Sequence, residues 1–189
     1  MTNLTQKLVI GGAVLVVGLV LGWATRGLTG YSPATQSMTS FDAWRVACPA
    51  ATQKDVSCEM IQDFVDSQSH TQIARIAVGK LPGGKPAMDI TMFLGVALEP
   101  GVGLSVGTDK ARTVQYRTCT QQGCIADIPI DDKLQASLDA GKDVKLVFGV
   151  INSDKLIGMP LTLKGYGDAK RAYNREEAKR GSWFWRMWS

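Results

Sequence analysis

The chain has 189 residues, of which 45% are hydrophobic, and a formal net charge of +4 from 21 basic and 17 acidic residues. This length fits one domain with appended segments, because autonomous cores usually take about 100 to 200 residues. A charge so small and so mixed argues against the strongly basic surface of a nucleic-acid-binding protein, so we expect no nucleic-acid partner.

An apolar segment occupies the N-terminus. Residues 8–25 contain no charged residue, Pro, Asn or Gln, and a helix of this length rises about 27 Å, close to the thickness of the hydrocarbon core of a bilayer. Lys7 precedes the segment, and Trp23 and Arg26 lie at its other end, where aromatic and basic side chains favour the membrane interface. The pattern predicts an uncleaved transmembrane signal-anchor over residues 1–26.

A cleaved secretory signal is the alternative, because Ser32 to Ala34 has small residues at the spacing of a cleavage site. That site lies well beyond the apolar run, and the run is longer than the roughly 7 to 15 residues typical of a signal peptide. Gly11, Gly18 and Gly22 share one face of the helix, where small residues allow a second helix to approach. Together with Trp23 they are candidate membrane or partner contacts, although membrane helices are generally rich in glycine.

A change in composition marks the start of a folded domain. Residues 27–40 are rich in Thr, Ser, Gly and Pro and contain little that could be buried, so we expect a flexible tether. Residues 41–166 then show apolar residues at every second position, which is typical of strands with one buried face. The clearest alternation covers residues 88–98, 144–150 and 157–163, and weaker alternation covers 44–48, 74–78 and 114–116.

The spacing of these strands indicates the fold class. Segments rich in Gly, Pro, Asn and Asp separate them, and strands at this spacing are typical of antiparallel folds. We therefore expect a mainly β, antiparallel β-sandwich or barrel-like domain. Pro160 lacks an N–H donor and predicts that the last strand lies at a sheet edge or contains a bulge.

One short helix interrupts the strand pattern. Asp131 is a favourable N-cap, and Gly141 is a typical stop after the last turn. Leu134 and Leu138 fall on one face between them. These features predict a helix over residues 132–140.

The four cysteines fit two local disulfides. Cys48 and Cys58 are separated by nine residues, and Cys119 and Cys124 by four, so neither pair has the spacing of a redox motif or a zinc site. The second pair spans a predicted hairpin turn, where facing strand positions bring Cα atoms close enough for a disulfide. Disulfides persist in oxidising compartments, so we expect the domain to lie in the periplasm and the N-terminus in the cytoplasm. Four reduced thiols in a cytosolic domain are the alternative.

A set of short motifs recurs through the domain in a combination typical of one protein family. The motifs are Trp44 to Cys48, Cys58 with Gln62, Pro100 to Leu104, Tyr116 to Cys119, Gly123 to Ala126, Leu134 to Gly141, Lys145 to Phe148, and Leu161 to Tyr166 followed by Ala169. On these motifs, the domain resembles the invasion-associated locus B (IalB) family of proteobacterial envelope proteins over roughly Phe41 to Ala172. The resemblance implies a secreted, disulfide-bonded, β-rich domain, associated in some bacteria with host-cell invasion and without an established catalytic role. Members of the family generally carry an ordinary signal peptide, so the apparent anchor and the aromatic C-terminus set this chain apart.

No motif indicates an enzyme or a cofactor. His70 is the only histidine and stands among Ser, Gln and Thr, which is typical of a surface loop. Asp127, Asp131 and Asp132 lack the alternation and the central Gly of a calcium loop. The glycines that follow Pro100 precede a strand, not a helix, so they do not predict a phosphate-binding loop. We expect no catalytic residue, no metal and no cofactor.

A basic helix begins the C-terminal segment, residues 167–189. Ala169, Ala172 and Tyr173 form a narrow apolar stripe, which predicts an amphipathic helix over residues 168–180. Glu176 and Arg180 have the spacing of a favourable i, i+4 ion pair. Gly181 is expected to end the helix.

The last residues are unusually aromatic, and leaving them in water would be costly at about 25 cal/mol per Å² of apolar surface. We expect them to lie in the lipid headgroup layer or in a groove on a partner, or else to pack on the domain itself. The candidate contacts are Trp183, Phe184, Trp185, Arg186, Met187 and Trp188.

These features predict a non-catalytic accessory or scaffold protein of the bacterial inner membrane. It would cross the membrane once, contact lipids, and bind a protein partner, expected to be a membrane complex, through its periplasmic domain. An envelope virulence factor that acts at host contact is the second hypothesis. A small-ligand carrier or enzyme is the third, and an enclosed polar pocket around His70 would be its sign.

Overall fold

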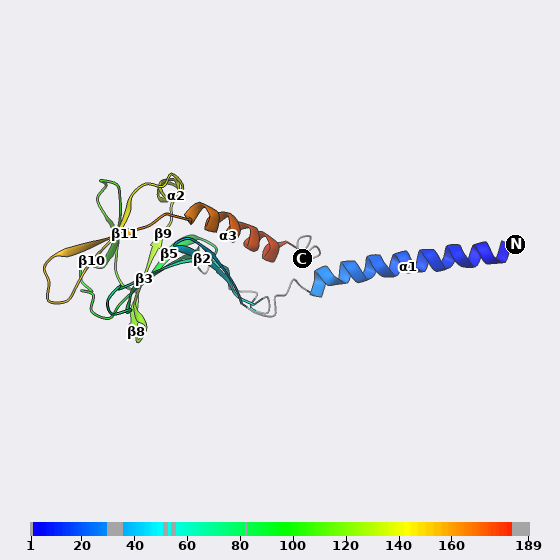
Figure 1. Ribbon diagram of the computed structural model, residues 1–189, viewed down its shortest axis with the longest axis horizontal. Coiled ribbons are helices and arrows are strands. Elements are labelled where there is room, and N and C mark those ends of the chain that lie inside the picture. Colours follow the sequence, from blue (N-terminus) through cyan, green and yellow to red (C-terminus); the bar gives the residue numbers. More distant parts are fainter. Residues whose placement is uncertain (1, 30–35, 51–52, 54–55, 82, 183–189) are drawn as a thin grey trace.

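The computed structural model describes the backbone of residues 2–29, 36–50, 53, 56–81 and 83–182, and the side chains of these residues except 2–5, 8 and 26–29. Within this part of the chain, two antiparallel sheets form the body of the protein, and helices lie beside them (Figure 1). The elements are α1 (Thr2–Thr29), β1 (Ser37–Phe41), β2 (Trp44–Cys48), β3 (Glu59–Val65), β4 (Gln72–Lys80), β5 (Pro86–Met92), β6 (Val102–Val106), β7 (Arg112–Val114), β8 (Thr118–Thr120), β9 (Gly123–Pro129), α2 (Asp132–Asp139), β10 (Val144–Gly149), β11 (Leu156–Leu161) and α3 (Tyr166–Gly181).

The two sheets confirm the predicted fold class. The larger sheet has seven strands in the order β1-β2-β3-β4-β5-β9-β8, and the smaller has four in the order β11-β10-β6-β7. Alternate side chains of both sheets point into one shared core, as the period of two predicts. Ile76 and Ile90 of the larger sheet and Leu146 of the smaller sheet are each 0% exposed. The fold is therefore a sandwich with neighbouring strands paired antiparallel.

Trp44 fixes the end of β11 to the larger sheet. Its side chain is completely buried, and its indole N–H donates to the Thr162 carbonyl at 2.9 Å. The side-chain amide of Gln62, which is also buried, donates to the same carbonyl at 2.9 Å. The Trp44 ring meets the ring of Tyr166 edge to face, with centroids 5.2 Å apart. The start of α3 is thereby held over β2 and β3.

α3 lies against the β1 end of the larger sheet. It packs against β1, β2 and β3, beside which it lies in Figure 1. Ala169 and Ala172 are buried at this contact, as the apolar stripe predicts, and their small side chains let the helix approach the strands closely. The helix begins at Tyr166, two residues before the predicted start.

α2 confirms the prediction made from its capping residues. Asp131 accepts a hydrogen bond from the Leu134 N–H at 2.9 Å, and Leu134 and Leu138 are buried in the core. Gly141 has φ +66°, the left-handed conformation that favours glycine after a helix.

α1 extends away from the two sheets in Figure 1. Nearly all of its described apolar side chains are exposed, as at Val9 (70%), Val14 (67%) and Leu19 (65%). Among the described residues, no helix combines the length and the apolar character that a membrane crossing requires.

The prediction of one continuous strand over residues 88–98 is wrong beyond Met92, where β5 ends. Gly95 has φ +147°, which takes the chain out of the strand, and Leu94 and Leu98 are 60% and 54% exposed. Only Val96 returns to the sheet pattern, through an isolated bridge to Val150. Apolar residues still occupy alternate positions here, although the backbone no longer belongs to the sheet.

The expected tether over residues 27–40 needs correction at both ends. Residues 27–29 belong to α1, and Ser37–Phe41 form β1, whose residues pair with β2 from Ser37 opposite Cys48 to Phe41 opposite Trp44. β1 is an edge strand with exposed side chains, so its stability comes from backbone hydrogen bonds that composition does not reveal. Residues 30–35 lie outside the described part.

Candidate functional site

Both predicted disulfides are present. Cys48 and Cys58 are joined with an S–S distance of 2.04 Å, and Cys119 and Cys124 with 2.05 Å. The second bond joins residues directly opposite each other on β8 and β9, as the predicted hairpin requires. The first closes a loop over residues 48–58, hereafter the disulfide loop.

The last turns of α3 are bound to the disulfide loop. One carboxylate oxygen of Glu177 accepts the Cys58 N–H at 2.8 Å, and the other pairs with the Lys80 Nζ at 3.0 Å. The Arg180 guanidinium donates to the carbonyls of Pro49 and Gln53 at 2.9 Å each, and to that of Val56 at 3.0 Å. The planar guanidinium has enough donors for several carbonyls at once.

The predicted ion pair between Glu176 and Arg180 is therefore wrong. Glu176 pairs instead with the Lys179 Nζ at 2.9 Å. Arg180 is engaged by loop carbonyls, for which it is a charged donor. Spacing along a helix finds only partners on the same helix, so this contact could not be found from the sequence.

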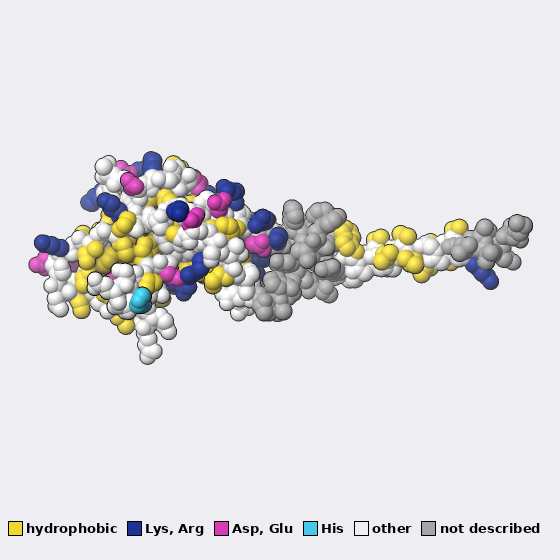
Figure 2. Space-filling model, in the orientation of Figure 1, with side chains coloured by type: hydrophobic (Ala, Val, Ile, Leu, Met, Phe, Trp, Pro, Cys, Tyr) yellow, Lys and Arg dark blue, Asp and Glu magenta, His cyan; other side chains and the backbone are white. Residues whose placement is uncertain are grey.

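The end of the sandwich away from the disulfide loop carries an exposed apolar surface. A groove of about 500 Å³ opens beside β11 and is lined by Ile73, Phe93, Phe148, Ile157 and Met159 among others. Figure 2 shows hydrophobic side chains gathered in the half of the domain away from α1, behind a tip that carries charged side chains. We call the exposed part of this surface the distal patch, and it consists of Leu94 (60% exposed), Leu98 (54%), Ile151 (56%), Leu156 (61%) and Ile157 (44%).

Backbone contacts bring the distal patch together from three separate segments. The Ile151 N–H donates to the Gly95 carbonyl at 2.9 Å, which sets residue 151 beside residue 94. Gly149 pairs with Leu156 across β10 and β11. Leu156, opposite Gly149, and Ile157, opposite Phe148, point to opposite faces of the smaller sheet, so the distal patch wraps around the end of that sheet. A monomeric protein seldom leaves so many large apolar side chains exposed at one end without a functional reason. The patch is thus a candidate interaction surface.

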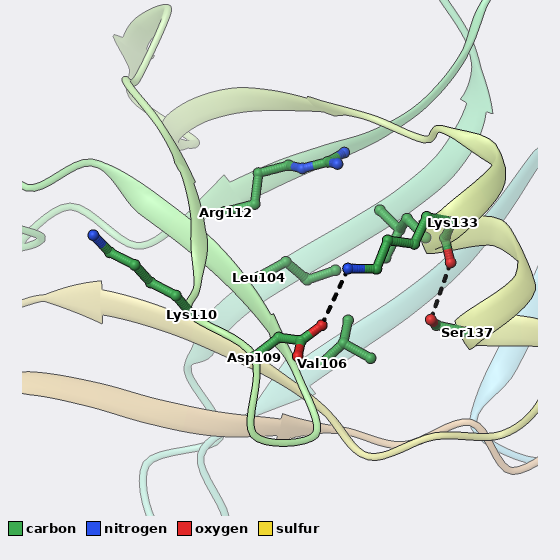
Figure 3. A pocket seen from close by; sticks show the side chains of 8 residues that line it. Leu104, Val106, Asp109, Lys110, Arg112, Lys133 and Ser137 are labelled. Atoms are coloured by element: carbon green, nitrogen blue, oxygen red, sulfur yellow. Dashed lines mark hydrogen bonds and ion pairs between the residues drawn. The ribbon is translucent and has the colours of Figure 1, made fainter.

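A second hollow, of about 320 Å³, lies between α2 and the turn that joins β6 to β7 (Figure 3). The Lys133 Nζ lies 3.4 Å from an Asp109 carboxylate oxygen, and Arg112 pairs with Asp131 and donates to the Pro129 carbonyl at 3.3 Å. The hydrogen bond from Arg112 is the main reason that the pKa of Asp131 lies below its ordinary value. These contacts tie β7 to the start of α2, and they explain the charged side chains without a ligand.

Two carboxylates lie side by side on the outer face of the larger sheet. Asp89 of β5 is directly opposite Asp127 of β9. Arg117 lies between them, with its Nε 3.0 Å from Asp127 and an Nη 3.7 Å from Asp89. Partial burial, and after it the negative charge of Asp127, raise the pKa of Asp89 to about 6.

His70 lies in an exposed polar turn, as predicted. The turn is closed by Asp66, whose carboxylate accepts from the Gln68 and Ser69 N–H groups at 3.0 and 2.7 Å. These hydrogen bonds, chiefly that from Ser69, lower the pKa of Asp66. No group of three or more His, Cys, Asp or Glu in the described residues is arranged to hold a metal ion.

The other residues that we expected to contact a membrane or a partner do not belong to the distal patch or to the disulfide loop. A side chain added at Gly11, Gly18 or Gly22 would meet no other atom within 4 Å, so these positions pack against nothing in the described structure. Trp23, on the same helix, is 43% exposed. The aromatic residues 183–188 lie outside the described residues.

Sequence patterns missed two features of these surfaces. The distal patch was hidden because Leu94 and Leu98 continue an apolar alternation that predicts burial. The Asp89 and Asp127 pair depends on the register between β5 and β9, which are separated in the chain. The sequence shows only that β5 and β9 each carry an acidic residue at a position that alternation places on the outer face of the sheet.

Comparison with known proteins identifies the family. The sequence model of the invasion associated locus B (IalB) protein matches residues 44–174. Invasion protein B homologues of Brucella abortus strains 2308 and 9-941 are each 26% identical over 137 residues, which cover 72% of this chain and 78% of theirs. The crystal structure of invasion associated protein B from Bartonella henselae has the same fold, with a TM-score of 0.63 and 24% identity, over 74% of this chain and 97% of that one. This chain therefore belongs to the invasion associated locus B family.

Proposed function

We propose that this protein is a membrane-anchored, non-catalytic envelope protein that binds a protein partner through the distal patch. The exposed apolar surface is the observation that carries the proposal. Leu94, Leu156 and Ile157 are large side chains that gain free energy when a partner removes them from water. The adjoining groove offers a concave site into which side chains of a partner fit.

The anchoring part of the proposal is supported by α1. Its backbone is helical over 28 residues, and nearly all of its described apolar side chains are exposed, on all sides. A lipid environment would remove this surface from water, and the helix satisfies its own backbone hydrogen bonds there. The two disulfides favour an oxidising compartment for the domain. This arrangement corresponds to a cytoplasmic N-terminus and a periplasmic domain.

The non-catalytic part is supported by the state of the polar groups. In the described part of the chain, charged side chains that lie close together form ion pairs with one another. Asp63, for example, pairs with both Arg45 and Arg75. His70 lies on an exposed turn, and it does not line the apolar groove that opens beside β11. A nucleophile, a base and an oxyanion donor would have to converge for most hydrolytic reactions.

The partner contact is tested by paired charge substitutions. Leu156→Asp places a charge in the distal patch, whereas Met38→Asp places one on an exposed apolar residue of β1, which is 57% exposed. After crosslinking in cells and extraction in mild detergent, the first variant should lose the crosslinked partner and the second should retain it. Recovery of the same partner with both variants, or of a monomer alone with the unaltered protein, would contradict the proposal.

A role at host contact is the second candidate, because the Brucella and Bartonella relatives are named as invasion proteins. This function requires the domain to leave the inner membrane. An N-terminus found after Ala34, on protein released from the inner membrane, would favour it over an anchored accessory protein. Intact-mass analysis of the envelope fractions distinguishes the two.

A further inference from the structure

The anchor side and the tail side of the domain meet at one place. Ser37, where β1 begins, is paired with Cys48 at the start of the disulfide loop. Arg180, in the last turn of α3, is bound to the Pro49 carbonyl, one residue further along. The chain therefore enters the domain from α1 and leaves it toward residues 183–189 beside the same loop.

The position of the second exit is fixed by specific contacts. Glu177 holds the backbone of Cys58 and the side chain of Lys80, and Arg180 holds three loop carbonyls. Ala172, five residues before Glu177 on the same helix, is buried in the core. We call the surface around these contacts the loop end. It consists of Glu177 and Arg180 of α3 and the residues that they contact, which are Pro49, Gln53, Val56, Cys58 and Lys80.

The distal patch lies at the opposite end. β4 connects the two, because Lys80 at its end is paired with Glu177, while Gln72 and Ile73 at its start line the apolar groove. The strand has nine residues, and at about 3.3 Å per residue it separates the two surfaces by roughly 27 Å. Figure 1 shows the loop end directed toward α1 and the β10–β11 hairpin directed away from it.

The length of the connection keeps the loop end near the anchor. α1 ends at Thr29 and β1 begins at Ser37, so the residues between them span at most about 25 Å when fully extended. Beside the loop end, the exposed Arg175 suits an anionic lipid surface, whereas Lys80 and Lys179 are already paired with Glu177 and Glu176.

We propose that the loop end is the face of the domain that meets the lipid headgroup layer, and that the distal patch consequently points away from the membrane. This inference rests on the proposed anchoring by α1. Because the chain both enters and leaves the domain on this face, anchoring of α1 in lipid directs the same face toward the bilayer. The partner would then be met at a distance from the bilayer surface.

Energy transfer to labelled lipid tests the orientation. A donor fluorophore is introduced on an unnatural side chain at Ala178, which is exposed on α3, or at Asp154, which is exposed in the β10–β11 turn. The full-length protein is reconstituted in phosphatidylcholine and phosphatidylglycerol vesicles that contain a headgroup-labelled acceptor. Because transfer to a layer of acceptors falls steeply with distance from that layer, we expect several-fold greater efficiency from Ala178 than from Asp154.

The result separates the inference from the proposed function. Equal efficiencies, or greater transfer from Asp154, would overturn the orientation even if the protein remains in the vesicles. Alkaline carbonate washing tests the anchor independently, because an anchored chain stays with the lipid and a peripheral one is released. The same comparison in vesicles of phosphatidylcholine alone keeps the contrast if the two exits set the orientation, and its loss there would contradict their role.

Discussion

Replacement of Asp89 by Asn should stabilise the protein, and only above acidic pH. In the folded state, burial and the facing Asp127 raise the pKa of Asp89 from 3.8 to about 6. The folded protein therefore keeps a proton that the unfolded chain has already released between these two pH values. Stability falls as pH rises through this window, since the folded state binds more protons there. Above it, the ionised Asp89 destabilises the fold to its full extent.

The size of the effect follows from the pKa difference. At about 1.4 kcal/mol per pKa unit, a rise from 3.8 to about 6 corresponds to roughly 3 kcal/mol. The Asp89 side chain is 39% exposed, so solvent screens much of this interaction, and we expect a gain of about 1 kcal/mol for Asp89→Asn at neutral pH. Part of the gain is offset because the pair with Arg117 is also lost.

Urea unfolding at about pH 4 and at about pH 7.5 measures the difference, because these values lie on either side of the window. The variant should match the unaltered protein at the lower pH and exceed it at the higher one. Asp154→Asn, on an exposed turn, removes the same charge and should show no such pH dependence. If Asp89→Asn loses the same stability at both pH values, the carboxylate pair is not a source of strain and the reasoning fails.

Three further substitutions test the contacts described above. Arg180→Ala removes the donors of the disulfide loop and should cost about 1 to 2 kcal/mol; protease cleavage within residues 49–57 should become faster, and an unchanged cleavage rate would count against the contact. Leu138→Ala removes most of a core side chain that is 1% exposed. The free energy of unfolding in urea titration should fall by about 2 to 5 kcal/mol, whereas a loss below about 1 kcal/mol would show that the α2 contact is loosely packed. Gly123→Ala places a Cβ 2.1 Å from the Met92 carbonyl oxygen at φ +140°, so the melting temperature should fall by several degrees, as expected for a loss of more than about 1 kcal/mol; an unchanged melting temperature would refute the close approach.

The elements that could be predicted are those whose signals are local. The α2 helix is specified by Asp131 and Gly141 at its two ends, and β10 by apolar residues at alternate positions. The Cys119–Cys124 disulfide follows from a hairpin that its own residues specify. In each case the interacting groups are only a few residues apart, so spacing alone carries the information.

The features that could not be predicted depend on which distant segments become neighbours. β1 forms because β2 offers it backbone partners, and nothing in its own polar composition indicates a strand. Arg180 binds a loop more than 120 residues earlier in the chain, so the residues near it on α3 do not reveal its partner. Leu94 and Leu98 show the opposite case. They continue an apolar alternation and yet are exposed, so alternation alone does not establish a buried strand.

Pro160 has a consequence for the behaviour of the protein at high local concentration. It lies in β11, at the edge of the smaller sheet and next to the exposed side chains of Leu156 and Ile157. An apolar sheet edge of this kind is a template on which further copies can polymerise into fibrils. Because Pro160 has no N–H to offer an added strand, it interrupts that template. An exposed apolar surface can thus lie beside a sheet edge without seeding the growth of fibrils.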